Sequence, residues 1–329
     1  MARPPALPQL IGRKIYKTGQ TRGADDDVIY QNRVSRSSTV LIDYSWPDDW
    51  WAPPPGESAF ENGFTVLIPP GVYFGTEGID AELAAKGLEL GKNCLVFYQT
   101  RKQWTDHPPL AGWQVPTSRS APIGGHYCAR VAGTTSAAGG ERIREGFTTS
   151  SLKGAGIRLY EYAGAKTTAA CHTQLEAVFW SCVDSVERAV ENGMIEGDAR
   201  KRRDWCLEEA ASQGLWDTER LWGARILNEE EVTVCPLCLQ RISAGGFYSR
   251  LAQAAGREVH DLTVTELNLF HIDELTLGSF NHRPYNLGWG HHHCNVVVRD
   301  SGIADTLEWM RETVERDARL RQPAENNGS

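Results

Sequence analysis

Two stretches decide the fold of this chain: His271-Ile-Asp-Glu-Leu-Thr-Leu-Gly278 and Asn286-Leu-Gly-Trp-Gly-His-His-His-Cys-Asn295. Cys235-Pro-Leu-Cys238 precedes them. Cysteines in this spacing can both reach one tetrahedral metal ion from a tight turn, and His291-x-x-Cys294 supplies a second pair about fifty residues later. The four residues predict a closed Cys₃His zinc site, which is structural because four protein ligands leave no open position for chemistry. The alternative is a pair of buried thiols beside an unrelated histidine cluster.

Composition limits the classes of protein that fit. The 329 residues are 41% hydrophobic and 23% charged, which is typical of a globular chain long enough for two domains. No apolar run approaches the roughly 20 residues that cross a bilayer, and the first residues lack the apolar core of a signal peptide. We therefore expect a cytoplasmic protein with no membrane partner. The net charge of −8 argues mildly against nucleic acid, although a local basic cleft is compatible with it.

Cysteine usage follows from that compartment. In a reducing environment a Cys-x-x-Cys pair favours metal binding or redox activity over a structural disulfide. The other cysteines have no such spacing, and we expect them to be ordinary buried thiols: Cys94, Cys128, Cys171, Cys182 and Cys206.

Residues 12–36 are rich in basic side chains interleaved with amides and hydroxyls. Such a segment can grip phosphate and read base edges, or it can be a solvated loop that leads into a strand, and the residues leave both interpretations open. The candidate DNA-binding residues in this segment are Lys14, Lys17, Arg22, Arg33 and Arg36.

The first half of the chain is dominated by strand signals. Runs rich in β-branched and aromatic residues predict strands at 40–42, 64–68, 72–74, 93–98 and 157–162, whereas one segment, 79–87, predicts a short helix. The proline-rich loop Trp46–Gly56 carries three tryptophans, which are expected to cover the edge of a core, with base stacking as the alternative. We predict a β-rich DNA-recognition domain over residues 1–165.

Helical periodicity begins after Gly164. It predicts a helix that stops at Gly193, a second over 198–212 and a third from about Asp217. This helical connector, residues 166–230, is a natural place for a dimer interface. Its basic run Arg200-Lys-Arg-Arg203 can lie on a DNA backbone, although such runs are more often solvated helix faces. A last amphipathic helix, with apolar positions from 303 to 314, is expected to pack on the C-terminal domain, and 321–329 to be a disordered tail.

The C-terminal motif resembles the zinc-bearing HNH, or ββα-metal, nucleases over roughly residues 232–300. The resemblance rests on the order Cys-x-x-Cys, His-Ile, a glycine seven residues after the histidine, Asn-Leu, and a ligand-x-x-Cys followed by Asn. It implies a ββα-metal nuclease domain over residues 231–320 and makes the whole chain an α+β protein.

The resemblance also implies roles for the matching residues. His271 would be the general base, for which an imidazole with a pKa near neutrality is suited. The Asn286 amide would organise the loop and orient that base, and Asn295 would ligate a catalytic cation. Mg²⁺, with Mn²⁺ as a substitute, would neutralise the scissile phosphate.

One position departs from the family pattern. The family usually has Asp or His immediately before the base, where this chain has Phe270. Asp273 is our preferred source of the missing ligand, with Glu274 and Asp300 as alternatives. In another register Asp273 is the ligand and Glu274 stands in the place of the base, but the glycine and asparagine spacing is then lost. Arg283 in the hairpin loop is expected to hold a phosphate, or else to be a plain turn arginine.

These observations predict a sequence-specific double-stranded DNA endonuclease, a Type II restriction enzyme that leaves 5′-phosphate and 3′-hydroxyl ends. A nuclease core of ~75 residues accompanies far more reading surface than a non-specific nuclease needs. The N-terminal part also resembles restriction enzymes of the BstXI kind, although no single motif carries that likeness. Duplex cleavage with one site per chain implies a homodimer or a higher homo-oligomer. The alternatives are a modification-dependent restriction enzyme, a junction or repair nuclease, and a non-catalytic zinc DNA-binding module.

Overall fold

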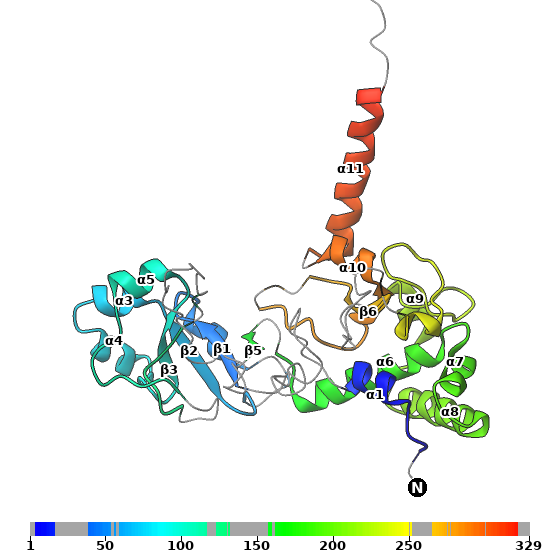
Figure 1. Cartoon of the computed structure of the whole chain (residues 1–329), viewed down its shortest axis with the longest axis horizontal. Helices are drawn as coiled ribbons and strands as arrows, with labels where there is room; N and C mark the ends of the chain where they lie inside the picture. Colours follow the sequence, from blue (N-terminus) through cyan, green and yellow to red (C-terminus); the bar gives the residue numbers. More distant parts are fainter. Residues whose placement is uncertain are drawn as a thin grey trace, which may run out of the picture.

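The protein is described by a computed structural model. It contains two packed units beside each other, a sheet unit and a helix-rich unit, with the last helix projecting away from them (Figure 1). The residues described are 4–16, 39–53, 56, 59–116, 123–129, 131, 157–159, 162–249, 251, 265–274, 276, 278–299 and 301–321.

The sheet unit is formed by five described strands in the order β4-β3-β2-β1-β5, and every adjacent pair is parallel. Parallel neighbours require crossover connections, and these carry the helices of the unit. The strands are β1 (Val40–Asp43), β2 (Phe64–Ile68), β3 (Cys94–Tyr98), β4 (Tyr127–Ala129) and β5 (Ile157–Arg158). The connections carry the 3₁₀ turn η1 (Asp48–Trp51) and the helices α3 (Pro70–Gly75), α4 (Ile79–Ala85) and α5 (Arg101–Asp106).

This unit is α/β, so the prediction of a β-rich domain with few helices is wrong. The strands predicted near 40–42, 64–68 and 93–98 are confirmed, but 72–74 belongs to α3. Pro70 is the first residue of that helix, where the fixed φ of proline and its missing N–H favour a helix start. The chain has to cross over between the parallel strands β2 and β3, and α3 is part of that crossing.

Both faces of the sheet are covered by apolar side chains. Alternate residues face opposite ways along a strand, and here Val40, Ile42 and Val66 belong to one buried cluster while Leu41 and Leu67 belong to another. The half-buried Trp51 stacks on Phe64 at the edge of the first cluster, with ring centroids 6.2 Å apart. This tryptophan therefore covers a core edge, as expected for the proline-rich loop.

The second unit contains helices and a β-hairpin. The predicted helix ending at Gly193 is divided into two by a turn at 181–184, whereas the other two predicted helices are confirmed. The elements are α6 (Ala165–Trp180), α7 (Ser185–Glu191), α8 (Glu196–Ser212), α9 (Thr218–Gly223), the 3₁₀ turn η3 (Ala244–Phe247), β6 (Leu267–His271), β7 (Leu287–His291), α10 (His292–Val298) and α11 (Ile303–Arg321).

An unpredicted N-terminal helix, α1 (Gln9–Tyr16), also belongs to this unit. It contributes the fully buried Ile11 and Ile15, which stand one helical turn apart, to the same core as α6. Residues 9–16 are therefore a helix packed on the C-terminal half rather than the start of a basic loop. The remaining predicted basic residues, Lys17, Arg22, Arg33 and Arg36, lie outside the described residues.

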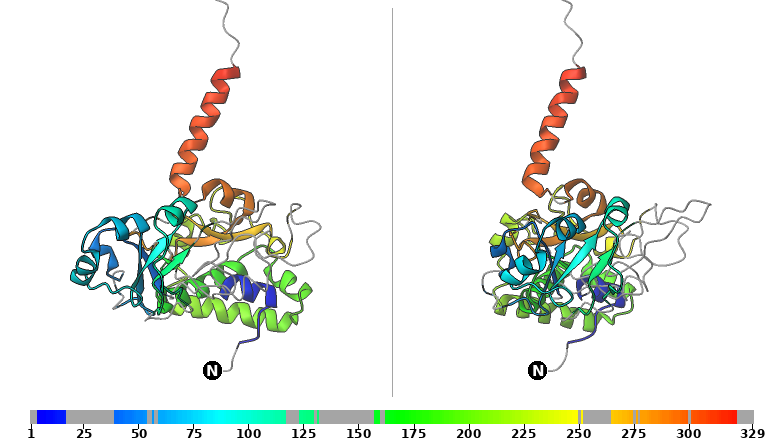
Figure 2. Two further views of the ribbon diagram at one scale, coloured as in Figure 1. Left: turned by 60° about the vertical axis from the view of Figure 1, so that its left-hand side comes forward. Right: turned by 90° about the vertical axis from the view of Figure 1, so that its left-hand side faces the viewer.

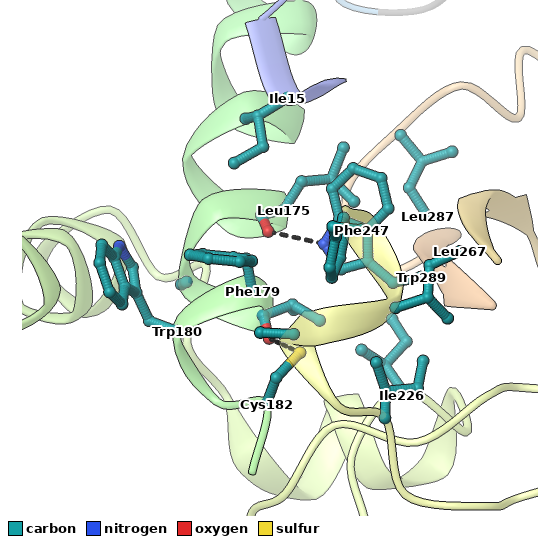
Figure 3. Packing of buried hydrophobic residues seen from close by; sticks show 14 of the residues in the cluster. Ile15, Leu175, Phe179, Trp180, Cys182, Ile226, Phe247, Leu267, Leu287 and Trp289 are labelled. Carbon is teal, nitrogen blue, oxygen red and sulfur yellow. Dashed lines mark hydrogen bonds between the residues drawn. The ribbon is translucent and has the colours of Figure 1, made fainter. Parts of the chain in front are cut away.

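One hydrophobic core joins α1, the helices and the hairpin. The Phe247 ring lies edge-on to Phe179 at 5.3 Å and to Trp289 at 4.9 Å. The Trp289 indole N–H donates to the Leu175 carbonyl at 2.9 Å (Figure 3). Residues on both sides of the predicted boundary at 230 contribute to this core. The five cysteines outside the motif are buried here or in the sheet, as predicted.

A buried ion pair ties α8 to α6. Glu176 is fully buried, and Arg202 donates to its two carboxylate oxygens at 2.6 and 2.7 Å. Tyr16 donates its hydroxyl to the same carboxylate. The basic run at 200–203 is therefore not a uniform solvated face, since Arg202 belongs to the core while Arg200 pairs with Glu196 at the surface.

The last helix extends into solvent. Ile303 and Thr306 are buried at its start, but Val314 and Leu320 are 69% and 86% exposed. Figure 2 shows it leaving the body of the molecule in both views. The expectation that this helix packs on the C-terminal unit is thus correct for its first part, up to Met310, which packs against the core of that unit. No helix in the described part of the chain has the length and apolar character to cross a membrane.

Candidate metal centre and active site

The first half of the metal centre is a tight turn at Cys235–Cys238. The Cys235 N–H donates to the Gln240 carbonyl at 2.9 Å, and the Leu239 N–H donates to the Cys235 carbonyl at 2.8 Å. Leu239 closes the turn with φ +59°, in the left-handed region that non-glycine residues seldom adopt. The backbone therefore folds back within a few residues, which holds the two cysteines of the pair together.

The second half comes from the junction of the hairpin and α10. His291 is the last residue of β7, and Cys294 lies in the first turn of α10. The ligand atoms of Cys235, Cys238, His291 and Cys294 all lie within 4.8 Å of one another. Zn–S bonds of about 2.3 Å and Zn–N bonds of about 2.0–2.1 Å put two ligands of a tetrahedral ion roughly 3.3–3.8 Å apart. The four residues therefore fit one zinc ion.

The electrostatics of this set are those of a cation site. Burial raises the pKa of the Cys294 thiol, and the neighbouring Cys235 and Cys238 raise it further. The Cys294 thiol therefore resists becoming a thiolate on its own, because burial and negative charge on its neighbours disfavour the charged form. A bound divalent cation reverses this balance and favours the thiolates.

The hairpin carries the candidate base. β6 and β7 are antiparallel, with Leu267 opposite His291 and His271 opposite Leu287, and α10 follows β7 directly. His271 is the last residue of β6 and is half-buried. The arrangement of these elements in space is therefore strand, strand and helix, with the histidine at the end of the first strand.

Phe270 is a core residue. Its side chain is fully buried in the cluster of the C-terminal unit. A methyl group on Gly290 of β7 would stand 2.4 Å from the Phe270 ring, so the glycine leaves the space that this ring occupies. The position before His271 therefore faces the core and has an apolar side chain, which leaves no metal ligand there.

A second histidine accompanies His271. This is His282 in the hairpin loop, whose side chain is only 1% exposed. The Nδ1 atom of His282 lies 3.3 Å from the Nε2 atom of His271. A hydrogen bond between two imidazoles requires one nitrogen to donate and the other to accept, so this contact selects tautomers and fixes the orientation of the His271 ring. Sequence patterns assign no role to His282, because its place depends on how the loop folds rather than on a spacing rule.

Asn286 organises the hairpin loop. Its side-chain oxygen accepts from the Asp273 N–H at 2.7 Å, and its side-chain nitrogen donates to the Asn281 carbonyl at 2.7 Å. The Asn286 carbonyl also accepts from the Ile272 N–H at 3.1 Å. The amide thus links the two sides of the loop, while the ring of His271 is contacted by His282.

Neither proposed cation ligand belongs to the zinc set. The Asp273 side chain is 61% exposed and one of its oxygens lies 3.9 Å from Nη2 of Arg283, itself 56% exposed. Asn295 is half-buried on α10, next to Cys294. Within the described ranges, the Cys₃His set is the group of histidines, cysteines and carboxylates that gathers closely enough for a metal ion. Asp300 lies outside the described residues.

Lys14 has a different environment from the one expected for a DNA contact. Its ammonium group donates to the Thr265 hydroxyl and to the Leu267 carbonyl, the latter at 2.8 Å, and lies 5.6 Å from the Phe247 ring centroid. Burial lowers the pKa of Lys14 to about 7. These contacts connect α1 to the start of β6 and favour a structural role over phosphate binding.

Comparisons with known proteins cover most of the chain. The family model described as BstXI restriction endonuclease matches residues 13–292. A solved structure titled "Crystal structure of a type II restriction endonuclease" is similar with a TM-score of 0.27 and 13% identity, over 50% of this chain and 59% of that one. The chain therefore spans less than two thirds of that structure's length. No curated protein matches the sequence.

Proposed function

The chain belongs to the BstXI restriction endonuclease family, and from that premise we propose that it cuts double-stranded DNA at a specific sequence with a ββα-metal centre built on His271. The observation that carries this proposal is the pair of histidines at the hairpin. His271 ends β6 with its imidazole held by the buried His282, and Asn286 links the two sides of the loop around them.

In the proposed reaction His271 takes a proton from a water molecule that attacks the scissile phosphorus. The new P–O bond forms as the bond to the 3′ oxygen breaks, and the leaving 3′ oxygen takes a proton from solvent, which gives 5′-phosphate and 3′-hydroxyl ends. An imidazole is suited to this step because its ordinary pKa lies near neutral pH. His282 contributes by keeping the ring in one orientation, which confines the proton transfer to one direction.

We propose Asn295 and Asp273 as ligands for Mg²⁺, with Mn²⁺ as a substitute. When bound, the cation would supply positive charge at the phosphate and at the leaving oxygen. Two observations support this role for Asp273: its carboxylate is exposed, and its backbone N–H donates to the Asn286 side chain. Arg283, beside Asp273, is the candidate phosphate contact.

We propose a structural role for zinc. His291 and Cys294 flank the point where β7 becomes α10, and Cys235 and Cys238 come from the segment that follows α9. An ion held by all four would fix the hairpin and its helix to the helical part of the unit. The centre would therefore be a support for the site rather than part of the chemistry.

The decisive experiment is digestion of a plasmid of known sequence by the His271→Ala variant and by wild type, with Mg²⁺ present. Loss of a general base should slow cleavage by about 10²–10⁴-fold, while affinity for the site is retained. Glu274→Gln is the matched control, because it removes the base of the alternative register and should cut normally. Sequencing the wild-type ends gives the site and the overhang, and methylated plasmid tests for modification dependence. Normal cleavage by His271→Ala would overturn the proposal.

We further propose a homodimer, since a duplex has two strands to cut and each chain has one site. Helix α11 is the candidate interface. Its apolar stripe consists of Leu307, Met310 and Val314 at helical spacing. Leu307 and Val314 are exposed, whereas Met310 packs against the core of the C-terminal unit. The first half of α11 has a net negative charge, from Asp305, Glu308 and Glu312 against Arg311, and the second half has a smaller net positive charge, from Arg316, Arg319 and Arg321 against Glu315 and Asp317. Antiparallel pairing with a second copy would bring opposite charges together around the stripe.

Sedimentation velocity tests this interface. Val314→Glu should weaken the dimer by about tenfold or more, because it puts a charge into the apolar stripe. Arg316→Ala changes the net charge by the same amount on the other side of the helix and should leave the dimer intact. A wild-type monomer at micromolar concentration, or equal effects of the two variants, would exclude α11 as the interface.

A further inference from the structure

The hairpin loop of the C-terminal unit reaches the sheet unit through one aromatic side chain. Phe280 lies between β6 and β7, is half-buried, and packs against the hydrophobic cluster on one face of the parallel sheet. The buried members of that cluster include Phe60, Leu159 and Tyr162. Among the described residues, Phe280 is the member of this cluster that comes from the C-terminal unit.

The backbone at Phe280 is held in an uncommon conformation. Its φ is +49°, in the left-handed region where a bulky side chain is rare. A conformation of this kind persists when the surroundings determine it from several sides. Here the ring is held by the sheet unit on one side, and the residues that follow are held by the hairpin on the other.

The two residues after Phe280 lead directly to the candidate base. Asn281 is buried, donates its side-chain N–H to the Glu274 carbonyl at 2.5 Å, and accepts from Asn286 with its own carbonyl at 2.7 Å. His282 follows, is buried as well, and contacts His271 at 3.3 Å. Three consecutive residues therefore connect the sheet cluster to the imidazole of His271.

We propose that Phe280 is a positioning residue through which the sheet unit holds the His271–His282 pair in its active arrangement. The ring does not touch the reacting atoms; it anchors the loop, and the loop sets the place of His282. Through this contact the N-terminal half of the chain bears on the chemistry as well as on the choice of DNA. The inference rests on the proposed role of His271 as the base.

Three variants of the full-length protein test this proposal by single-turnover cleavage at saturating enzyme. Phe280→Ala should cut about 10- to 100-fold more slowly, because small displacements of a catalytic group cost rates of this order, with DNA affinity within about threefold of wild type. Phe280→Leu keeps an apolar anchor and should recover most of the rate. Phe64→Ala is the matched control: Phe64 is also half-buried against the same cluster, but it belongs to β2 of the sheet unit and stacks on Trp51.

Amide hydrogen exchange supplies a readout that does not depend on cleavage. The Asp273 N–H donates to the Asn286 side chain, so its exchange should become faster in Phe280→Ala and stay unchanged in Phe64→Ala. The pH midpoint of cleavage should also move in Phe280→Ala alone, because His271 then loses its fixed partner.

Several outcomes would overturn the inference. The first is that Phe280→Ala and Phe64→Ala slow cleavage equally. The second is that Phe280→Ala cuts at the wild-type rate. The third is that Phe280→Ala cuts slowly while amide exchange at Asp273 stays unaltered. The fate of the proposed function is read separately from His271→Ala. If that variant is inactive while Phe280→Ala behaves as wild type, the function stands and the positioning role fails. If His271→Ala cuts normally, the base assignment fails whatever Phe280 does.

Discussion

In the sheet unit every residue of β3 is buried, and the strands present apolar side chains to both faces. In the C-terminal unit the hairpin buries polar side chains, Asn281, His282 and Asn286, close to the apolar core that contains Phe270. Apolar packing tolerates exchange of side chains of similar volume. Buried polar groups need each of their partners, because a single unsatisfied one is costly. The unit that carries the candidate chemistry is therefore also the one in which single substitutions should be most damaging.

The largest difference in stability between the two units is expected when a cysteine of each is replaced. Cys235→Ser removes a ligand of the proposed zinc site, and because metal binding contributes directly to folding, the variant should lose its zinc and roughly 5 kcal/mol or more of unfolding free energy. Cys94→Ser places a hydroxyl in the buried sheet, where burial raises the pKa of the native thiol to about 12, and should cost about 1–3 kcal/mol. Urea unfolding and zinc content measure both. A Cys235→Ser protein with full zinc and wild-type stability would contradict the metal centre.

The next largest difference in stability between the two units is expected at their ion pairs. Arg202→Ala leaves the buried Glu176 carboxylate without its cation, which costs about 3–5 kcal/mol in comparable buried pairs. In the sheet unit, Lys86 lies 3.6 Å from Asp48 with side chains 30% and 62% exposed, so Lys86→Ala should cost about 0–1 kcal/mol. Urea unfolding of the two variants supplies the comparison. Equal losses would show that the Glu176–Arg202 pair is not the buried support that its geometry indicates.

A smaller effect is expected where β7 meets Phe270. Gly290→Ala forces a methyl group against the Phe270 ring and should cost about 1–3 kcal/mol through overpacking. Gly288→Ala, two residues earlier, meets its nearest neighbour, Ile226, at 3.4 Å, and should cost less. Phe270→Leu in the Gly290→Ala background should recover part of the loss, because residues in contact are not additive. Additive losses in thermal unfolding would argue against direct packing of this pair.

The same comparison explains which parts of the structure were predictable from sequence. The Cys₃His set, the hairpin and the helices after residue 165 depend on short spacings, which a linear pattern records. The parallel sheet depends on pairings such as Val40 with Ile157, more than a hundred residues apart, and no local pattern records those. A usable signal was present, since Phe64–Ile68 and Cys94–Tyr98 are nearly continuous apolar runs without alternation, as in strands covered on both faces.

Individual residues show the same limit within the site. Ile11 and Ile15 stand at helical spacing, so α1 could have been predicted from its periodicity. His282 could not, because its contact with His271 depends on the path of a loop fixed by Asn281, Asn286 and the packing of Phe280. Spacing rules identified residues that share one turn or one strand end, whereas the partner of the candidate base comes from tertiary structure.

The smallest expected effect concerns Lys14, which joins α1 to the hairpin. Burial lowers its pKa to about 7 from an ordinary value of 10.5. Between these two pH values the unfolded chain holds a proton that the folded protein lacks, so the contribution of Lys14 makes stability rise with pH. Below about pH 7 both states are protonated and the dependence disappears, and above about pH 10.5 both are neutral.

Lys14→Met should therefore flatten the rise of unfolding free energy with pH, most clearly between about pH 7.5 and 9.5. The change in slope is at most about 1.4 kcal/mol per pH unit, the value for one proton, and less here because the side chain keeps some contact with solvent. Lys92→Met, at an exposed lysine of the sheet unit, controls for the altered net charge. If both variants follow the wild-type slope, the Lys14 ammonium stays protonated in the folded protein, and the contacts with Thr265 and Leu267 are those of an ordinary charged lysine. If Lys14→Met alone flattens the rise of unfolding free energy with pH, the Lys14 side chain that joins α1 to the hairpin is a neutral amine in the folded protein. This buried polar contact then resembles those of the hairpin rather than the apolar packing of the sheet.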